Sequence, residues 1–289
     1  GAFQSAPLRR YDGYSNTLYS NDPLDPNSLA GNWTVSLCAD SKGFIWIGTA
    51  GYGLDCLDPI TGNFKHFRHN PKNPNSLSND VVWSILEDRD GILWIGTQRG
   101  LNRYDPNTGR FTRYYHQPND PYSLSCNQVE NIYEDSQGTL WVGTGRIWTG
   151  EGGETDEGGL NRFDKKGNKF IRYMHEPLNP RSLINNKVKA IFEDSRGTFW
   201  VGTAGDGLHT MDRDQGTFQR HLYDPVHPKN LSRPPQKKIP VSADDHITFI
   251  IEDATGSIWI GTFGNGLNRY DPETKQVTHY PNLDPVSGA

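Results

Sequence analysis

The chain of 289 residues has a net charge of -5, only 34% hydrophobic residues and a mean hydropathy of -0.74. Its 29 basic residues are spread evenly among 34 acidic ones, so no basic stripe predicts nucleic-acid binding. No apolar run approaches the roughly 20 residues of a membrane-spanning helix, and residues 1–10 lack the apolar middle of a signal peptide. We therefore expect no nucleic-acid partner and no direct membrane insertion of this segment.

The first predicted element is a half unit at about residues 7–30. Leu8–Asp12 matches the later stretch Leu101–Asp105, and Asp25–Leu29 matches the links that follow the later units. These matches predict the outer two strands of a blade, whereas residues 282–289 offer no inner strand pair to complete it. We expect the chain to be a fragment of a longer propeller protein rather than a ring that closes in an unusual way.

Five complete units follow, at about residues 31–78, 79–126, 127–185, 186–244 and 245–281. Each carries the tetrapeptide Trp-Ile-Gly-Thr or Trp-Val-Gly-Thr, and the first two tryptophan spacings are 48 and 47 residues. A period in the high forties is typical of propeller blades. The tetrapeptides begin at Trp46, Trp94, Trp141, Trp200 and Trp259.

The second unit is the clearest copy of the repeat. β-Branched and aromatic stretches predict four strands, and they are separated by turns rich in Asp and Gly. Four antiparallel strands make one propeller blade. We therefore predict an all-β propeller, forming a single domain over 1–289, with five complete blades after an N-terminal half blade. The predicted strands of this unit are 81–87, 92–97, 101–104 and 111–115.

The motifs Asp88-Arg89-Asp90-Gly91 and Trp94-Ile95-Gly96-Thr97, together with Gly100–Pro106 and the link Pro118–Leu124, resemble the two-component regulator propeller repeats. The resemblance covers almost the whole chain. In that family such repeats form the extracellular or periplasmic sensor region of hybrid histidine kinases, commonly as seven-bladed rings, and several members sense oligosaccharides. The resemblance thus implies a periplasmic or extracellular location and a ligand-sensing role upstream of a kinase.

The repeated residues themselves predict structure rather than chemistry. A large aromatic at a periodic strand position is ordinarily core, so the tryptophans are expected to pack between blades. The turn residues Asp88, Asp90, Asp135 and Asp194 offer too few carboxylates per turn for calcium. No zinc or catalytic signature is present, so we expect no metal, no cofactor and no enzymatic activity. The odd number of cysteines, Cys38, Cys56 and Cys126, predicts unpaired structural thiols.

Two insertions interrupt the repeat, at 145–157 and at 223–246. In an up-and-down blade the connection between strands two and three emerges on the same face as the link to the next blade, so both insertions are expected on one face. Varied loop side chains on a fixed scaffold are typical of binding sites, although long loops are also tolerated without function. The predicted ligand-binding residues are Tyr52, Gln98, Arg99, Arg146, Trp148, Asp206, Phe263 and Asn265.

Two functional hypotheses follow from these observations. The first is a non-catalytic extracytoplasmic sensor that binds a small molecule or a glycan, such as an oligosaccharide. The alternative is a structural or protein-interaction propeller that associates with another chain, or with itself, through its incomplete blade, because unpaired strand edges favour pairing with a neighbour.

Overall fold

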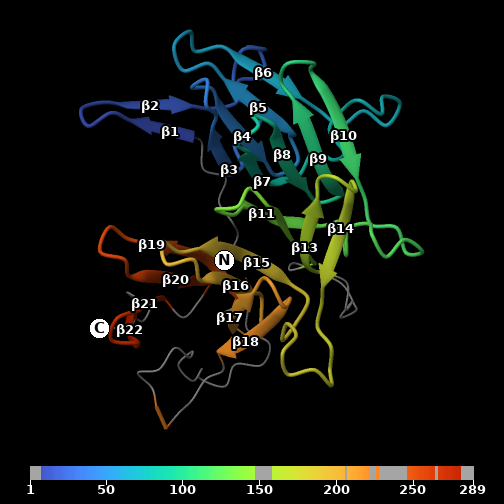
Figure 1. The fold of residues 1–289 in the computed structure, drawn as a ribbon. Helices are drawn as coiled ribbons and strands as arrows, with labels where there is room; N and C mark the ends of the chain where they lie inside the picture. The colour runs from blue at the N-terminus through green and yellow to red at the C-terminus, as the bar shows by residue number, and fades with distance from the viewer. Residues whose placement is uncertain are drawn as a thin grey trace, which may run out of the picture. The chain divides into compact units, whose positions relative to one another are not determined.

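The computed structural model describes residues 8–146, 158–205, 207–221, 226–227, 246–263 and 266–280. Within these ranges every regular element is a β-strand. The strands form five four-stranded antiparallel sheets and one two-stranded sheet (Figure 1). This confirms the predicted all-β fold of propeller blades, in which a half blade precedes the complete ones.

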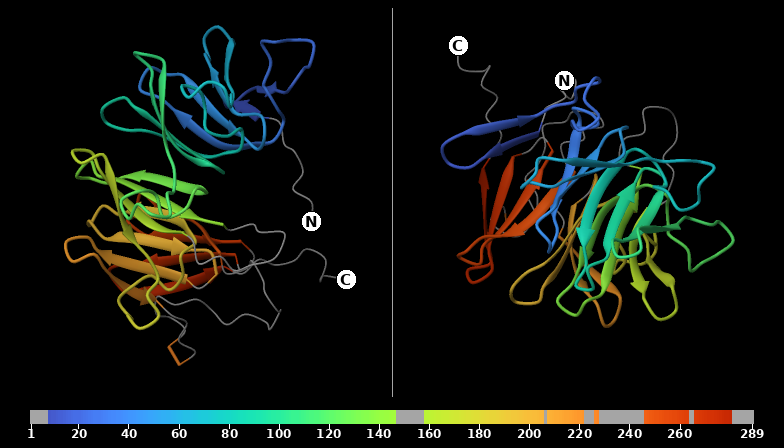
Figure 2. Two further views of the ribbon diagram at one scale, coloured as in Figure 1. Left: turned by 90° about the vertical axis from the view of Figure 1, so that its right-hand side faces the viewer. Right: turned by 90° about the horizontal axis from the view of Figure 1, so that it is seen from above.

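The chain divides into two compact units, 1–132 and 133–289, with the boundary inside one strand, β11. Each unit is described by itself, and the prediction of a single domain stays a prediction. The first unit begins with the two-stranded sheet β1–β2, visible as a separate ribbon in Figure 2. Its strands are β1 (Leu8–Tyr11), β2 (Asn16–Tyr19), β3 (Thr34–Ala39), β4 (Ile45–Thr49), β5 (Leu54–Leu57), β6 (Phe64–Phe67), β7 (Val82–Glu87), β8 (Leu93–Thr97), β9 (Gly100–Asp105), β10 (Arg110–Tyr114) and β11 (Val129–Glu134).

The second unit carries the remaining strands. Each sheet pairs its strands in chain order, from β11 to β14, from β15 to β18 and from β19 to β22. The strands are β12 (Leu140–Gly145), β13 (Gly158–Asp164), β14 (Lys169–Tyr173), β15 (Val188–Glu193), β16 (Phe199–Thr203), β17 (Gly207–Asp212), β18 (Thr217–His221), β19 (Ile247–Glu252), β20 (Ile258–Thr262), β21 (Leu267–Asp271) and β22 (Gln276–Tyr280).

The turn between the first two strands of a blade also fixes the tryptophan. In the second complete blade Asp88 Oδ1 accepts the backbone N–H of Ile92, and Gly91 takes a φ of 72°, a conformation that favours glycine. Asp88 Oδ2 accepts a hydrogen bond from Trp94 Nε1 at 2.8 Å. The same aspartate–tryptophan bond recurs in the other four complete blades at 2.7–2.9 Å. The sequence predicted a role in the turn for these aspartates, but it did not predict their hydrogen bond to the tryptophan indole.

The tryptophans of three blades pack against the next blade as predicted, with ring contacts at 4.8–5.8 Å from Trp46 to Tyr104, from Trp141 to Phe199 and from Trp200 to Tyr270. Four of the five are buried, and each indole packs against the aromatic ring at the end of the fourth strand of its own blade, at centroid distances of 5.5–6.1 Å. The glycine two residues further on permits close approach, since a Cβ on Gly48 would lie 2.7 Å from Val82 Cγ1 of the next blade. The aromatic partners are Phe67, Tyr114, Tyr173, His221 and Tyr280.

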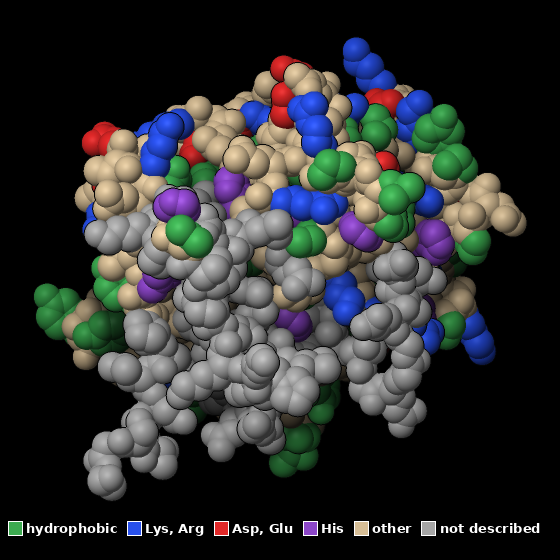
Figure 3. Space-filling view, turned by 90° about the horizontal axis from the view of Figure 1, so that it is seen from below, with side chains coloured by type: hydrophobic (Ala, Val, Ile, Leu, Met, Phe, Trp, Pro, Cys, Tyr) green, Lys and Arg blue, Asp and Glu red, His purple; other side chains and the backbone are tan. Residues whose placement is uncertain are grey.

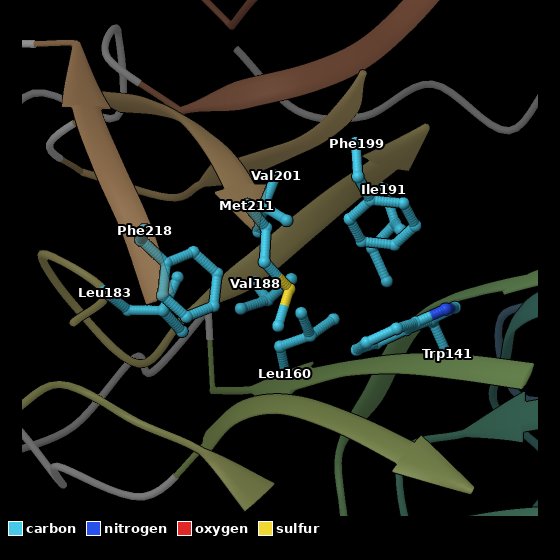
Figure 4. Close-up of a cluster of buried hydrophobic side chains, with 9 residues drawn as sticks. All are labelled: Trp141, Leu160, Leu183, Val188, Ile191, Phe199, Val201, Met211 and Phe218. Carbon is cyan, nitrogen blue, oxygen red and sulfur yellow. The ribbon is translucent and has the colours of Figure 1, made fainter. Parts of the chain in front are cut away.

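A core cluster in the second unit illustrates the packing between consecutive blades (Figure 4). Trp141 and Leu160 of one blade lie against side chains of the next, and nine buried residues make up the cluster. Burial of large apolar surface of this kind is the main stabilising contribution to the fold. The members are Trp141, Leu160, Leu183, Val188, Ile191, Phe199, Val201, Met211 and Phe218.

In three complete blades a buried polar side chain on the third strand ties the preceding link to the blade. In the first unit Asn102 Oδ1 accepts the N–H of Ser78 at 2.9 Å, and Asp55 Oδ2 accepts that of Ala30 at 2.7 Å. In the second unit His209 takes this position, and its Nε2 accepts the N–H of Ile184 at 3.0 Å. Because Nε2 accepts, Nδ1 carries the proton and donates to Val201 O.

Candidate functional site

Three of the predicted ligand-binding residues lie in the first unit, on the β4–β5 and β8–β9 connections. Tyr52 is 48% exposed, and its ring lies against Gly31 with the Arg68 guanidinium 5.8 Å from the ring centroid. The side chains of Gln98 and Arg99 are exposed. The backbone N–H of Gln98 donates to Val81 O, and that of Arg99 donates to Thr97 Oγ1. These side chains are accessible to a ligand.

The other predicted residues belong to the second unit. Arg146 is exposed, and Phe263 is 45% exposed with its ring 6.5 Å from that of His246. Trp148, Asp206 and Asn265 lie outside the described residues, as do most of both insertions. The prediction of a ligand site on this set of loops therefore stays a prediction.

A cavity of about 350 Å³ lies elsewhere in the first unit, between the blade β3–β6 and the blade β7–β10. It opens at the β3–β4 and β5–β6 turns, the opposite end of the strands from Tyr52. None of the eight predicted residues lines it. Its lining comprises Asp40, Lys42, Phe44, Trp46, Cys56, Asp58, Asn63, Phe64, Lys65, Phe67, Tyr104 and Pro106.

The floor of the cavity is aromatic. The Trp46 ring lies 5.5 Å from Phe67 and 5.6 Å from Tyr104, and the Phe67 and Tyr104 rings are 5.3 Å apart. Trp46 is held from its edge by the bond to Asp40 Oδ2 at 2.8 Å. Rings packed and anchored in this way form a preorganised surface for a planar, cationic or saccharide group.

Charged groups surround this floor. Asp40 and Asp58 supply two carboxylates, and Lys42 and Lys65 supply two ammonium groups on exposed side chains. Backbone N–H of Ile60 and the hydroxyl of Thr61 lower the pKa of Asp58, so it is ionised at neutral pH. Lys65 Nζ lies over the Phe67 ring, 4.9 Å from the centroid. The cavity thus combines an apolar base with charges of both signs.

Cys56 is a small side chain that lines this cavity beside Trp46. In the sheet register Cys56 lies opposite Trp46 and Thr210 opposite Trp200, whereas the residues opposite Trp94, Trp141 and Trp259 are arginines. Arg269 places its Cζ 5.9 Å from the Trp259 centroid, so the long side chain lies over the indole. A cysteine leaves that space open. The arginines are Arg103, Arg162 and Arg269.

The Cys56 thiol is not an activated nucleophile. Burial raises its pKa to about 11, with Asp40 adding to the effect and Lys65 opposing it. The thiol is therefore protonated at neutral pH and contributes shape rather than reactivity. Cys38 lies two strands away on the same sheet, opposite the other side of Trp46, and the three cysteines are free thiols.

Sequence reasoning missed this cavity, although the signal was present. Aligning the units on the tetrapeptide places a small residue, Cys56, in a column that holds arginine in three other units. The remaining unit holds Thr210 in this column, so two of the five units have a small residue opposite the tryptophan.

Other classes of site are sparse in the part of the chain that the structure describes. There, no group of three His, Cys, Asp or Glu side chains could hold a metal ion, and no helix is long and apolar enough to cross a membrane. Figure 3 shows one face on which lysine and arginine side chains are spread among acidic and hydrophobic ones. The predicted absence of a nucleic-acid partner stays a prediction.

Solved structures with the same fold include a domain of a two-component system and a component of a secretion system. The extracellular domain of a hybrid two-component system from B. thetaiotaomicron matches with a TM-score of 0.74 and 24% identity, over 97% of this chain and 33% of that one. PorZ, a surface component of the type-IX secretion system of Porphyromonas gingivalis, matches with a TM-score of 0.63 and 18% identity, over 94% and 37%. At these identities the likeness establishes the propeller fold alone.

An enzyme also shares the fold. Virginiamycin B lyase from Staphylococcus aureus, in a catalytically inactive form with quinupristin, matches with a TM-score of 0.62 and 15% identity, over 96% of this chain and 78% of that one. No curated protein matches the sequence.

The family match corrects one prediction. A family model described as SMP-30/Gluconolactonase/LRE-like region matches residues 34–283. Because that family is named for a lactonase, the prediction that the chain is not an enzyme is wrong. It relied on the lack of a local catalytic motif, and a propeller can assemble a site from residues on different blades. The match covers most of the chain, which therefore belongs to the SMP-30/Gluconolactonase/LRE-like region family.

Proposed function

We propose that this chain is a ligand-sensing propeller of a two-component signalling protein, located in the periplasm or outside the cell. Two observations support the proposal. The repeat motifs resemble two-component regulator propeller repeats, and the fold matches the extracellular domain of a hybrid two-component system across 97% of this chain. The chain spans 33% of that domain, so the signalling output lies with the full-length protein.

The cavity between β3–β6 and β7–β10 is the observation that carries the proposal. Its aromatic floor and charged rim meet the usual description of a ligand pocket, an apolar base with a few placed polar groups. It also lies between two blades, with Trp46 on one and Tyr104 on the other. A ligand that contacts both blades favours one arrangement of the pair over others, and this differential affinity is what a sensor needs.

Binding screens can test the proposal, beginning with the oligosaccharides that the family resemblance implies. Thermal unfolding of the whole chain is measured with oligosaccharides, amino-acid derivatives and small anions. Two variants locate any ligand that raises the Tm: Cys56→Arg fills the cavity, and Tyr52→Ala alters the loop end of the same blade. Loss of the shift in Cys56→Arg alone supports the cavity, loss in Tyr52→Ala alone supports the loops, and a panel without any binder contradicts ligand sensing.

Self-association is a second candidate, favoured by the two-stranded sheet β1–β2. Its side chains are unusually exposed, with Tyr11 at 68%, Tyr14 at 99% and Leu18 at 53%. Exposed strands with apolar side chains favour pairing with another chain. Sedimentation velocity over a hundredfold range of concentration tests this candidate, and a monomer throughout, matched by a Leu18→Lys control, contradicts it.

A further inference from the structure

We propose that the cavity between β3–β6 and β7–β10 binds the side chain of an arginine residue from a partner protein or peptide. The inference rests on the proposed function, because it takes the cavity as the ligand site, and it names a different ligand class from the oligosaccharide that the resemblance implies. A second groove in the same chain already contains an arginine side chain, which comes from the chain itself.

That second groove lies between the blades β11–β14 and β15–β18. Arg213 enters it from the turn after β17, and its Nη1 and Nη2 donate to Asp135 Oδ2 at 2.9 Å and to Glu193 Oε1 at 2.5 Å. The guanidinium carbon lies 5.1 Å from the Phe199 centroid. The two carboxylate side chains are only 1% and 5% exposed. An arginine thus bridges two acids over an aromatic surface.

The first groove carries the same pair of acids. Asp40 is the counterpart of Asp135, since each accepts the N–H of its blade's tryptophan at 2.8 Å. Glu87 is the counterpart of Glu193: Glu87 accepts the N–H and hydroxyl of Ser41 at 2.6 and 2.9 Å, and Glu193 accepts those of Ser136 at the same distances. Among the described residues no basic side chain contacts Asp40 or Glu87.

The basic residues of the second groove are replaced in the first by side chains that leave space. Pro106 follows the aspartate that ends β9, as Arg213 follows the aspartate that ends β17, and Cys56 occupies the strand position of Arg162. Pro106 and Cys56 both line the cavity. The cavity therefore coincides with the place of Arg213 in the other groove and with the strand position of Arg162.

A guanidinium suits this space better than an ammonium or an anion. Its planar fork can donate to Asp40, which lines the cavity, while its face stacks on Trp46 or Tyr104. Glu87 is not among the lining residues, but it is bonded to Ser41, next to Asp40, and by the equivalence with Arg213 a guanidinium would reach both acids. Three aspartates, Asp40, Asp58 and Asp55, raise the pKa of the Cys56 thiol electrostatically, whereas Lys65 alone lowers it. The field inside the cavity thus favours a cation. Lys42 and Lys65 are exposed at the rim and reach neither Asp40 nor Glu87.

Titration calorimetry of the whole chain with N-acetyl-arginine amide tests the inference. The neutral isostere N-acetyl-citrulline amide and N-acetyl-lysine amide are the comparison probes, and free L-arginine distinguishes a chain residue from the amino acid. We expect arginine amide to bind at least about tenfold more tightly than citrulline amide, because charge-assisted bidentate bonds are lost in citrulline. Glu87→Gln should weaken binding about tenfold.

Matched variants keep the result interpretable. Glu252→Gln changes the corresponding glutamate of another groove, where Arg196 already lies 3.3 Å away, and should leave the affinity unchanged. Cys56→Ser preserves the cavity and the binding, and Cys56→Arg abolishes binding without loss of fold. Equal affinity for citrulline amide, or preferential binding of phosphate through Lys42 and Lys65, overturns the arginine assignment. If a saccharide binds in the cavity and arginine does not, only this inference fails; if nothing binds, the proposed function fails too.

Discussion

The groove between β11–β14 and β15–β18 and the groove between β3–β6 and β7–β10 are built from the same repeat and differ in what they contain. In the former, Arg213 joins Asp135 and Glu193 and leaves 18% of its own side chain exposed. In the latter, Asp40 is half-buried beside a cavity of about 350 Å³. The repeat therefore supplies an acidic, aromatic-lined groove in both cases, and individual residues decide whether an arginine of the chain fills it.

We call the groove that holds Arg213 the filled groove and the one with the cavity the open groove. Removing the arginine from the filled groove should have the largest effect on stability. Arg213→Ala leaves the carboxylates of Asp135 and Glu193 buried without their cation, which typically costs about 3 kcal/mol. Burial pushes the pKa of Glu193 upward, but hydrogen bonds from Ser136 and Arg213 outweigh it and hold that pKa below its usual value. Urea unfolding at pH 7 measures the loss.

A comparison in the open groove serves as the control for Arg213→Ala. Pro106→Ala, at the equivalent position, should change stability by less than about 0.5 kcal/mol because no charge depends on Pro106. Adding Glu193→Gln to Arg213→Ala should restore part of the lost stability. If the two single variants cost the same, the grooves do not differ in the way the structure indicates.

The second largest effect concerns acid, because the third strand of one blade in the second unit carries His209 where the first unit carries Asn102. Burial lowers the pKa of His209 to about 4, from about 6.5 in an unfolded chain. The unfolded state therefore binds more protons between these values, so stability is lost as pH falls from about 6.5 to about 4. The difference between these two pKa values corresponds to about 3 kcal/mol at most, and about 2 kcal/mol with partial relaxation.

Thermal unfolding between pH 7 and pH 4 checks this dependence in wild type and His209→Asn. The asparagine imitates Asn102, whose Oδ1 accepts the link N–H of Ser78. The variant should lose a large part of the acid sensitivity. The remaining part should come from His221, whose pKa is also lowered to about 4 by burial. Identical pH profiles would contradict a role for His209.

A third comparison concerns the tryptophans of the two grooves. Trp141→Phe and Trp46→Phe each remove one hydrogen bond to an aspartate, from a donor that is 1% exposed in the first case and 4% in the second. Neither variant leaves the aspartate unsatisfied, because buried Asp135 keeps the bond from Arg213 Nη1 to the same Oδ2, and half-buried Asp40 is accessible to solvent. We expect a loss of about 1 kcal/mol for each variant by urea unfolding, the usual net contribution of one hydrogen bond. A loss twice as large in Trp141→Phe would contradict compensation by Arg213.

Much of the fold was predictable from sequence because it depends on local, periodic signals. The Asp-x-x-Gly turns, the Trp-Ile/Val-Gly-Thr strands and the link motifs each specify backbone or packing in one blade. The candidate site was less predictable, because it depends on what Cys56 and Pro106 lack relative to Arg162 and Arg213. Such differences acquire meaning only when sheet register shows that Cys56 lies opposite Trp46. Catalysis, excluded for want of a motif, was misjudged for a similar reason.

The smallest expected effect comes from making the open groove resemble the filled ones. Cys56→Arg introduces the residue that lies opposite the tryptophan in three other blades, next to Trp46 and within reach of Asp40. Stacking and a partly exposed ion pair each contribute little, so the gain should be about 0.5–1 kcal/mol. Cys56→Ser, which adds no volume, should leave the Tm unchanged. If Cys56→Arg destabilises the chain instead, the cavity does not have the dimensions and charge of an arginine site, and the equivalence between the two grooves is broken at its central position.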